Sequence, residues 1–405
     1  MRNVLINNYS YFSRESIEKI KKDYKFSQNR HIELLLWDFE IFAQMSAIHN
    51  GFVLKGGAAT QIYLEPEKQR ASRDIDFATT LTKKEVEGVL EKIRLRFESH
   101  KTHEDHFKWS IVPAPKDPAK TIEDLDCYDV IVPTFFGKPI GQTNITELRI
   151  DAIHYKQIPF VIKELKEAKI FGMPIKPFKI VSEGSLIADK LLTLADHTVG
   201  VFARNPEKVE SYLKQLYDLT HLIDKFITYQ QVQNDILETL KKLIPLELKY
   251  KSLSKSVEDI LKDIVNSLEK RKYVDYDPSE TGIEFRGSID DFQGNYINNP
   301  GSVPSYEWAA RIGKIQFIVQ LLLRRINGKI PETELDEILK MLKNAEQKLA
   351  VIKGDELKKV RTDLMLYFKG EKSVKKQLKN ALLKRVFFGI ITQENAKELF
   401  KRIGV

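Results

Sequence analysis

The stretch Gly51–Phe77, GFVLKGGAATQIYLEPEKQRASRDIDF, decides how the rest of the sequence is interpreted. A strand-like run, Phe52–Leu54, is followed by Lys55-Gly56-Gly57 and by a short helical pattern at Ala58–Leu64. The stretch ends with Asp74-Ile75-Asp76-Phe77. Consecutive glycines let the backbone turn tightly and approach a ligand without interference from a Cβ atom.

The two ends of this stretch supply complementary groups for a triphosphate and a divalent metal ion. A helix that opens at the glycine turn directs N–H groups with a partial positive charge toward an anion. In a strand, residues two apart share a face, so Asp74 and Asp76 project together while Ile75 and Phe77 face the core. Paired carboxylates on a strand suit Mg²⁺, and two such ions stabilise the attacking and leaving oxygens of an in-line displacement.

Each motif has a plainer interpretation when it occurs alone. A Gly-Gly pair is more often a simple turn, and an Asp-x-Asp is more often a solvated strand edge. Here they occur together in order, with apolar residues at the alternate positions and with Arg70-Ala71-Ser72 in front of the aspartates. This combination favours the functional interpretation.

The combination resembles the signature of polymerase-β-like nucleotidyltransferases, a Gly-Gly turn followed by Asp-x-Asp. The finer resemblance is to the AbiEii/AbiGii toxin-type nucleotidyltransferases, which include the MenT-type toxins. Their pattern, Leu-Lys-Gly-Gly and then Arg-x-Ser-x-Asp-Ile-Asp-Phe, is matched by Leu54–Gly57 and Arg70–Phe77. Sixteen residues separate Gly57 from Asp74, a longer gap than the signature has, and we expect the insert Glu65–Gln69 to form a loop that preserves the geometry.

The resemblance implies roles for residues of this stretch. It implies that nucleotide is bound by Lys55, Gly56, Gly57 and Ser72. It also implies that Asp74 and Asp76 hold Mg²⁺ or Mn²⁺.

A third carboxylate is expected on the strand-like segment Thr146–Ile153. Its apolar residues Leu148, Ile150 and Ala152 alternate with Glu147, Arg149 and Asp151. By position and pattern Asp151 resembles the third carboxylate of this enzyme class, as a metal ligand or as the general base for an attacking hydroxyl. Glu147, on the same face, is the substitute. The alternative is that Asp151 is a solvated residue paired with Arg149 or His154.

Two later helical segments complete the resemblance. Leu186–Leu191, Leu-Ile-Ala-Asp-Lys-Leu, places Lys190 at the family's functional lysine; the alternative is a lysine whose stem lies on the core and whose head reaches water. In the helical pattern Tyr212–Ile223, Lys214 and Asp218 share a face. The family shows Lys-Asp-x-x-Asp there, and Gln215 replaces the middle acid. The resemblance gives Lys214 a nucleotide contact, and it gives Asp218 either a supporting role beside Lys190 or a contact with the nucleotide sugar or base. The alternative is a surface ion pair between Lys214 and Asp218.

Composition restricts the class of protein. The chain has 405 residues, enough for two or three domains, and no apolar run reaches the length of a bilayer span. The N-terminus lacks the apolar segment of a signal peptide, and the single cysteine, Cys127, excludes an internal disulfide and argues against a cysteine-based zinc site. The short cluster His103–His106 fits a polar loop better than a metal site. We expect a cytoplasmic protein without a membrane segment.

The positive charge lies in the last segment of the chain. The net charge is +8, and residues 351–405 contain 14 Lys plus Arg against 6 Asp plus Glu, which leaves 51 of each sign elsewhere. This excess fits an anionic polymer as partner. The alternative is a solvated helical face rich in lysine.

The predicted fold is α/β (α+β). We expect a polymerase-β-like nucleotidyltransferase domain with a small mixed sheet and N-terminal helices at residues 1–225, then a mainly helical C-terminal domain at residues 226–405. Residues 273–304 have little periodicity and many turn residues, so an irregular loop is expected there. Its aromatic residues are expected to anchor it to the core; the alternative is that they stack on bases.

The resemblance also implies a function. Proteins of this kind are toxins of toxin–antitoxin or abortive-infection systems, restrained by a cognate antitoxin, and some transfer a nucleoside monophosphate from an NTP to the 3′ end of tRNA. Two alternatives remain open from the residues alone. One is nucleotidyl transfer to a small molecule or a protein hydroxyl. The other is a non-catalytic protein that binds nucleotide or RNA.

Overall fold

The computed structural model describes residues 4–26, 29–70, 72, 74–99, 108–112, 125–134, 144–201, 208–275, 277–297 and 303–405. The chain divides into two compact units, each of three segments. The first contains 1–189, 245–253 and 292–301, and the second contains 190–244, 254–291 and 302–405. The unit boundary therefore falls between Asp189 and Lys190, earlier than the predicted domain boundary after residue 225. Ala71, Arg73, His103–His106 and Tyr276 lie outside the described residues.

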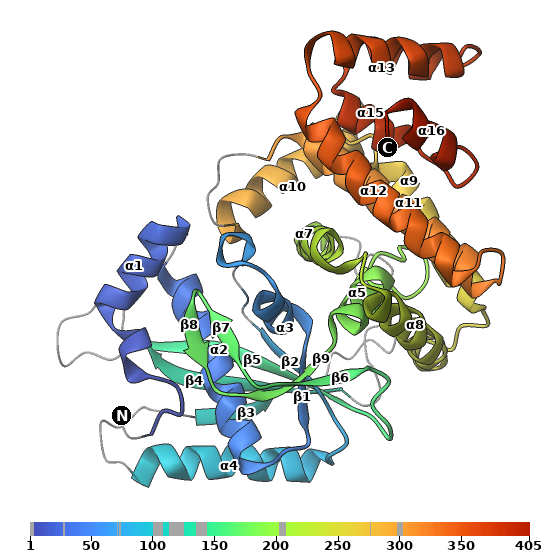
Figure 1. Ribbon diagram of the computed structural model, residues 1–405. Coiled ribbons are helices and arrows are strands. Elements are labelled where there is room, and N and C mark those ends of the chain that lie inside the picture. Colours follow the sequence, from blue (N-terminus) through green and yellow to red (C-terminus); the bar gives the residue numbers. More distant parts are fainter. Residues whose placement is uncertain are drawn as a thin grey trace. The chain divides into compact units, whose positions relative to one another are not determined.

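The first unit is built on a mixed sheet, whose described strands follow the order β3-β4-β5-β2-β1-β9-β6 (Figure 1). Strands β2 and β5 run parallel, as do β1 and β9, and the other neighbours are antiparallel. Strands β7 and β8 form a separate hairpin. The strands are β1 (Phe52–Lys55), β2 (Asp74–Thr79), β3 (Lys108–Val112), β4 (Leu125–Thr134), β5 (Asn144–His154), β6 (Ile162–Leu165), β7 (Ala168–Ile170), β8 (Met173–Ile175) and β9 (Phe178–Val181).

Helices α2 (Asn29–Ile48) and α4 (Lys83–Ser99) cover one face of this sheet (Figure 1). The ring of Phe77 lies 6.3 Å from that of Phe42 on α2 and 5.1 Å from that of Phe52 on β1. Ile75 and Phe77 are fully buried, so the predicted alternation of β2 is confirmed and its aspartates project to the opposite face.

Local signals set the ends of the remaining helices of this unit. Ser13 caps α1 (Arg14–Tyr24) by accepting a hydrogen bond from the Ser16 N–H. Thr82 and Glu85 form a capping box at the start of α4, with the Thr82 N–H donating to Glu85 Oε2 over 2.7 Å. The short helices are η1 (Tyr9–Phe12), η2 (Pro66–Lys68) and α3 (Gly56–Tyr63).

The second unit, as far as the structure describes it, consists of helices. Three of them belong to it only in part, since α5, α8 and α10 cross the unit boundaries. The helices are α5 (Glu183–Leu192), α7 (Val209–Phe226), α8 (Gln230–Tyr250), α9 (Val257–Arg271), α10 (Glu280–Tyr296), α11 (Ser305–Ile326), α12 (Glu332–Val351), α13 (Gly354–Tyr367), α14 (Lys372–Asn380), α15 (Leu383–Ile390) and α16 (Ala396–Arg402). Helices α11 and α15 approach closely, because a Cβ on Gly313 would lie 2.2 Å from the carbonyl oxygen of Phe388. The mainly helical C-terminal part is therefore confirmed, and with it the α/β fold class.

Two expectations for this part of the chain need correction. The predicted irregular loop contains α10, in which Phe285, Ile289, Phe292 and Tyr296 are buried at helical spacing. Glycines at 282, 287 and 294 obscured that periodicity. The helical pattern of residues 374–388 also predicts a single helix, and the structure has two helices there, α14 and α15. Among the described residues, no helix is long and apolar enough to cross a membrane.

Candidate active site

The register of the sheet aligns three of the predicted site residues in one row. Lys55 on β1 is paired with Asp76 on β2, and Asp76 is paired with Asp151 on β5. Because directly paired residues project to the same face of a sheet, the carboxylates of Asp76 and Asp151 lie side by side. Asp74, two residues earlier on the same face, is paired with Arg149. Glu147 lies beyond the end of the β2–β5 pairing, so the position opposite Asp76 belongs to Asp151.

The negative charges in this row disfavour one another. Burial raises the pKa of Asp76 to about 7, and the carboxylates of Asp151 and Asp74 act in the same direction. Lys55 opposes them, but its ammonium is already paired with Asp189, whose Oδ2 lies 3.3 Å away. Burial is the largest single influence on Lys55 and works against its charge, yet Asp189, Asp76 and the other acidic groups around it together outweigh burial, and the pKa of Lys55 is raised.

Asp151 has one feature of each interpretation that the sequence left open, the site carboxylate and the residue paired with Arg149. It lies opposite Asp76, and its Oδ1 also accepts a hydrogen bond from Arg149 Nε over 3.0 Å. On its other side Asp151 is paired with Cys127, whose thiol is buried. Burial raises the pKa of Cys127 to about 11, and Asp151 adds to the shift, so this thiol stays protonated and is no nucleophile.

The glycine turn lies directly against the aspartates. Gly56 has φ +66°, and a Cβ there would lie 1.9 Å from Asp76 Oδ2. Helix α3 starts at Gly56, and its N-cap residue, Lys55, makes no side-chain cap to the first turn. The first N–H groups of the helix therefore keep the capacity to bind an anion beside the carboxylates.

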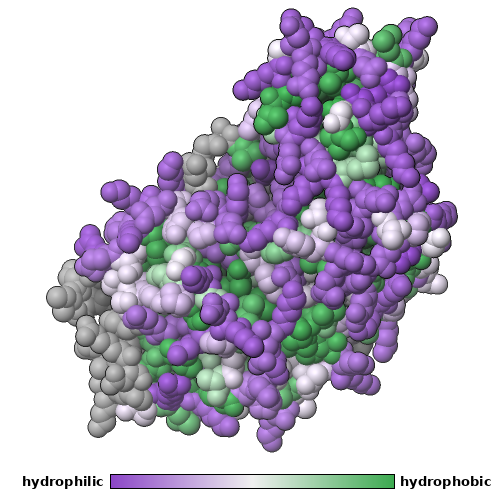
Figure 2. All heavy atoms as spheres, viewed as in Figure 1, coloured by the Kyte–Doolittle hydropathy of each residue, from purple (hydrophilic) through white to green (hydrophobic). Residues whose placement is uncertain are grey.

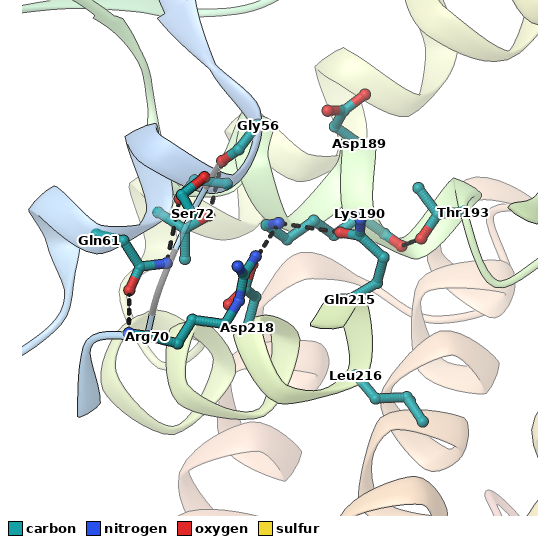
Figure 3. Close-up of polar contacts among 12 residues, drawn as sticks. Gly56, Gln61, Arg70, Ser72, Asp189, Lys190, Thr193, Gln215, Leu216 and Asp218 are labelled. Atoms are coloured by element: carbon teal, nitrogen blue, oxygen red, sulfur yellow. Dashed lines mark hydrogen bonds and ion pairs between the residues drawn. The ribbon is translucent and has the colours of Figure 1, made fainter. Parts of the chain in front are cut away.

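Ser72 and Arg70 flank the same turn. A Cβ on Gly57 would lie 3.0 Å from Ser72 Oγ and 3.3 Å from an Arg70 guanidinium nitrogen. The amide of Gln61 donates to the Gly57 carbonyl over 3.1 Å and accepts from the Arg70 N–H over 2.7 Å (Figure 3). Gln69 donates to the Gln61 carbonyl over 2.8 Å. These bonds tie the inserted segment to α3, which explains how the longer gap keeps Ser72 beside the glycines.

In the second unit, Lys190 is held by two acceptors from α7. Its ammonium donates to Asp218 Oδ2 over 2.7 Å and to Gln215 Oε1 over 3.0 Å (Figure 3). The side chains of Lys190 and Asp218 are 3% and 0% exposed, so the ion pair is buried and the interpretation of Lys190 as a solvated lysine is wrong. Gln215, which stands where the family has the middle acid, thus contacts the lysine. Lys214 forms an ion pair with Glu210 over 2.8 Å, one turn earlier on the same helix.

Comparison with known proteins identifies the family. A family model described as nucleotidyl transferase AbiEii toxin, type IV toxin–antitoxin system, matches residues 41–273, more than half of the chain. The chain belongs to the AbiEii nucleotidyltransferase toxin family. The matched range contains both groups described above, the row of Lys55, Asp76 and Asp151 in the first unit and the residues around Lys190 in the second. The protein is thus a nucleotidyltransferase enzyme, and its family implies an NTP substrate and a cognate antitoxin.

Solved structures resemble this AbiEii protein only distantly. The crystal structure of a putative nucleotidyltransferase from H. pylori has a TM-score of 0.35 and 17% identity, over 75% of this chain and 97% of the other. MenT4, a nucleotidyltransferase toxin from Mycobacterium tuberculosis H37Rv, has a TM-score of 0.40 and 14% identity, over 80% of this chain and 98% of the other. No curated protein matches the chain.

The residues of the AbiEii site fit a divalent metal ion by their chemistry. Asp74 and Asp76 provide hard carboxylate oxygens, and the raised pKa of Asp76 reflects burial and unfavourable negative charge, which a cation would relieve. Among the described residues, no three acidic, histidine or cysteine side chains are already arranged to hold an ion. The predicted ligand set Asp74, Asp76 and Asp151 therefore stays a prediction, and Asp151 is also held by Arg149.

The AbiEii site includes residues that the sequence patterns did not single out. Asp38 on α2 is buried, and neither of its carboxylate oxygens has a hydrogen-bond partner in the described structure. Burial raises its pKa well above the ordinary value, and Asp74 and Asp76 add to the shift. The sequence feature that could have drawn attention to Asp38 is the position of an acidic residue between Trp37 and Phe39 in an apolar helix. Arg70 and Asp189 belong to the motifs Arg70–Phe77 and Leu186–Leu191, but the sequence patterns gave neither residue a role.

Replacement of Gly56 by alanine tests the close approach of the turn to Asp76. We expect a loss of about tenfold or more in nucleotidyl transfer, because the left-handed backbone disfavours a Cβ by about 1–2 kcal/mol and the methyl group would displace the Asp76 carboxylate. Steady-state transfer assays measure the loss. Gly88→Ala in α4 is the matched control, since its Cβ meets nothing within 4 Å, and we expect full activity. Full activity in Gly56→Ala would contradict this geometry.

Proposed function

We propose that this AbiEii enzyme transfers a nucleoside monophosphate from an NTP to the 3′ end of tRNA, with Mg²⁺ (or Mn²⁺), in the cytoplasm. The observation that supports it best is the carboxylate row of Asp76 and Asp151 beside the glycine turn. The positive charge of residues 351–405 supports a nucleic acid as the acceptor.

The proposed reaction is an in-line displacement at the α-phosphorus. An oxygen of the acceptor hydroxyl forms a bond to that phosphorus, the bond to the β-phosphate bridging oxygen breaks, and pyrophosphate leaves. The N–H groups at the start of α3, with Ser72, would bind the triphosphate. Asp74 and Asp76 would hold a divalent ion, which supplies charge stabilisation to the phosphates when bound.

The remaining residues have roles in positioning and proton transfer. Asp151, oriented by Arg149, would accept the proton of the acceptor hydroxyl. Lys55, whose ammonium is fixed by Asp189, would offset part of the negative charge of Asp76 and its neighbouring aspartates. We assign to Lys190 the neutralisation of phosphate charge, with its ammonium held in place by Asp218 and Gln215. Lys214 is assigned a nucleotide contact on the family pattern.

Incubation of the protein with each α-labelled NTP, Mg²⁺ and total tRNA tests this function. We expect label from at least one NTP on tRNA, none after chelation of the metal, and recovery when Mg²⁺ is restored. The Asp74→Ala variant should give none. Label on protein or on a small molecule without RNA would replace the tRNA proposal with one of the alternatives. No transfer from any NTP to any acceptor would contradict it.

A further inference from the structure

The positive charge of residues 351–405 is unevenly neutralised in the second unit. Many of its basic side chains are held by acids of the same unit. These pairs are Lys358 with Asp355, Lys384 with Glu307, Arg385 with Asp275, Lys397 with Glu334 and Arg402 with Asp363, at 2.7–3.0 Å. Such residues are already compensated, so they contribute little to an excess charge on the surface.

Helix α14 holds four positive charges without such compensation within nine residues. Within the part of the chain that the structure describes, none of its four lysines, Lys372, Lys375, Lys376 and Lys379, forms an ion pair. Their spacing of three, four and seven residues places all four on one face of the helix. Like charges at this spacing repel each other, by about 0.2–0.5 kcal/mol for each pair. We call these residues the lysine ridge.

The orientation of the lysine ridge is fixed by the opposite face of α14. Leu378 is fully buried there. The Arg361 guanidinium, from α13, donates to the carbonyl oxygens of Leu378 and Ala381, the latter over 2.7 Å. Both oxygens lie at the C-terminal end of α14, where helix carbonyls lack intrahelical partners. The lysines are therefore presented by an anchored helix, and their backbone needs no ordering when a partner binds.

The lysine ridge forms one wall of a groove of about 460 Å³. The other wall is α13, with Thr362, Met365 and Leu366, and Leu366 is 66% exposed. Over α13, Figure 2 shows hydrophilic residues with small hydrophobic patches between them. A groove with lysines on one side and exposed aliphatic groups on the other suits a ligand with regular anionic charge and less polar groups between the charges. A nucleic-acid strand, with its phosphates, sugars and bases, has this composition.

We propose that the lysine ridge binds the phosphate backbone of the RNA acceptor without reading its sequence, an inference that rests on the RNA acceptor of the proposed function. Lysine is a compact point charge that contacts phosphate without the paired, planar geometry of arginine, which suits backbone binding. A helical pitch of 5.4 Å brings successive lysines within reach of successive phosphates. Each phosphate contact releases condensed counterions, so the affinity depends on salt.

The test is tRNA binding by the full-length protein as a function of salt. In one variant all four ridge lysines are replaced by glutamine, which removes the charge and keeps the helix propensity. The slope of log affinity against log salt concentration is negative, and we expect its magnitude to fall by about 3 in this variant. Four phosphate contacts are lost, and each contributes about 0.7–0.9 to the slope. The affinity at low salt should fall at least tenfold, equally for tRNAs of different sequence.

A matched control replaces four lysines that are exposed but ion-paired, Lys242, Lys262, Lys340 and Lys358, by glutamine. We expect its salt slope to match that of the wild type. Thermal unfolding checks that both variants fold, and the double variant Lys376→Gln/Lys379→Gln should show about half of the slope change. If the ridge variant and the control have the same salt slope, the proposal is overturned.

The experiments distinguish failure of the ridge proposal from failure of the proposed reaction. If the protein transfers no nucleotide to tRNA yet binds it through the ridge, the proposed reaction fails and the ridge stands. If it labels tRNA and the ridge variant binds tRNA like the wild type, the reaction stands and the ridge proposal fails. Binding of an acidic polypeptide such as polyglutamate that is lost in the ridge variant, with tRNA binding unchanged, would overturn it in favour of an acidic protein partner.

Discussion

Replacement of Asp76 by asparagine is expected to reduce nucleotidyl transfer by about 10³-fold or more. Asp76 lies at the centre of the row, opposite both Lys55 and Asp151 and against the glycine turn. Its carboxylate would bind the divalent ion that stabilises the charge of the transferring phosphate. Loss of several kcal/mol of this stabilisation corresponds to a reduction in rate of about 10³-fold. Initial rates with saturating NTP and metal measure the effect on turnover.

The same substitution should leave the fold intact. The raised pKa of Asp76 shows that its environment disfavours the carboxylate charge, through burial and the neighbouring aspartates. A neutral amide of the same shape relieves this repulsion, so the unfolding temperature should not fall. Asp355→Asn is the control, because that side chain is 96% exposed, and its activity should be that of the wild type. Retention of more than about a tenth of the activity in Asp76→Asn would show that chemistry occurs elsewhere.

The second large effect is expected at the buried pair of Lys190 and Asp218. Replacing Lys190 by methionine removes the Lys190 ammonium from the fully buried Asp218, and loss of one member of a buried ion pair costs about 3–5 kcal/mol. Asp218→Leu should cost a similar amount for the same reason. Urea unfolding measures both. Lys242→Met is the control, since Lys242 and Glu238 are about half exposed and such a pair contributes at most about 1 kcal/mol.

The double variant Lys190→Met/Asp218→Leu separates structure from function. Because both charges are removed, stability should return to within about 1 kcal/mol of the wild type or exceed it. If Lys190 serves the reaction, this stable variant remains deficient in nucleotidyl transfer. A double variant that is both stable and fully active would show that the pair has only a structural role.

The sequence by itself determined the local parts of the site. The Gly56 turn and the alternation of Asp74, Ile75, Asp76 and Phe77 depend on backbone preferences and on the two-residue repeat of a strand, which neighbouring residues encode. The same holds for the capping box at Thr82 and Glu85 and for most helices. The motif spacing was also sufficient to indicate the family that the comparison confirms.

Only the tertiary structure decided which distant side chains meet. The pairing of Asp76 with Asp151 required the register of two strands, and that of Lys55 with Asp189 joins residues 134 positions apart. Helix α10 was missed because buried contacts of Phe285 and Phe292 stabilise it against its glycines. The charge state of Asp76 and the burial of Lys190 likewise depend on what surrounds them. Burial and register are properties of packing between segments, and no local pattern encodes them.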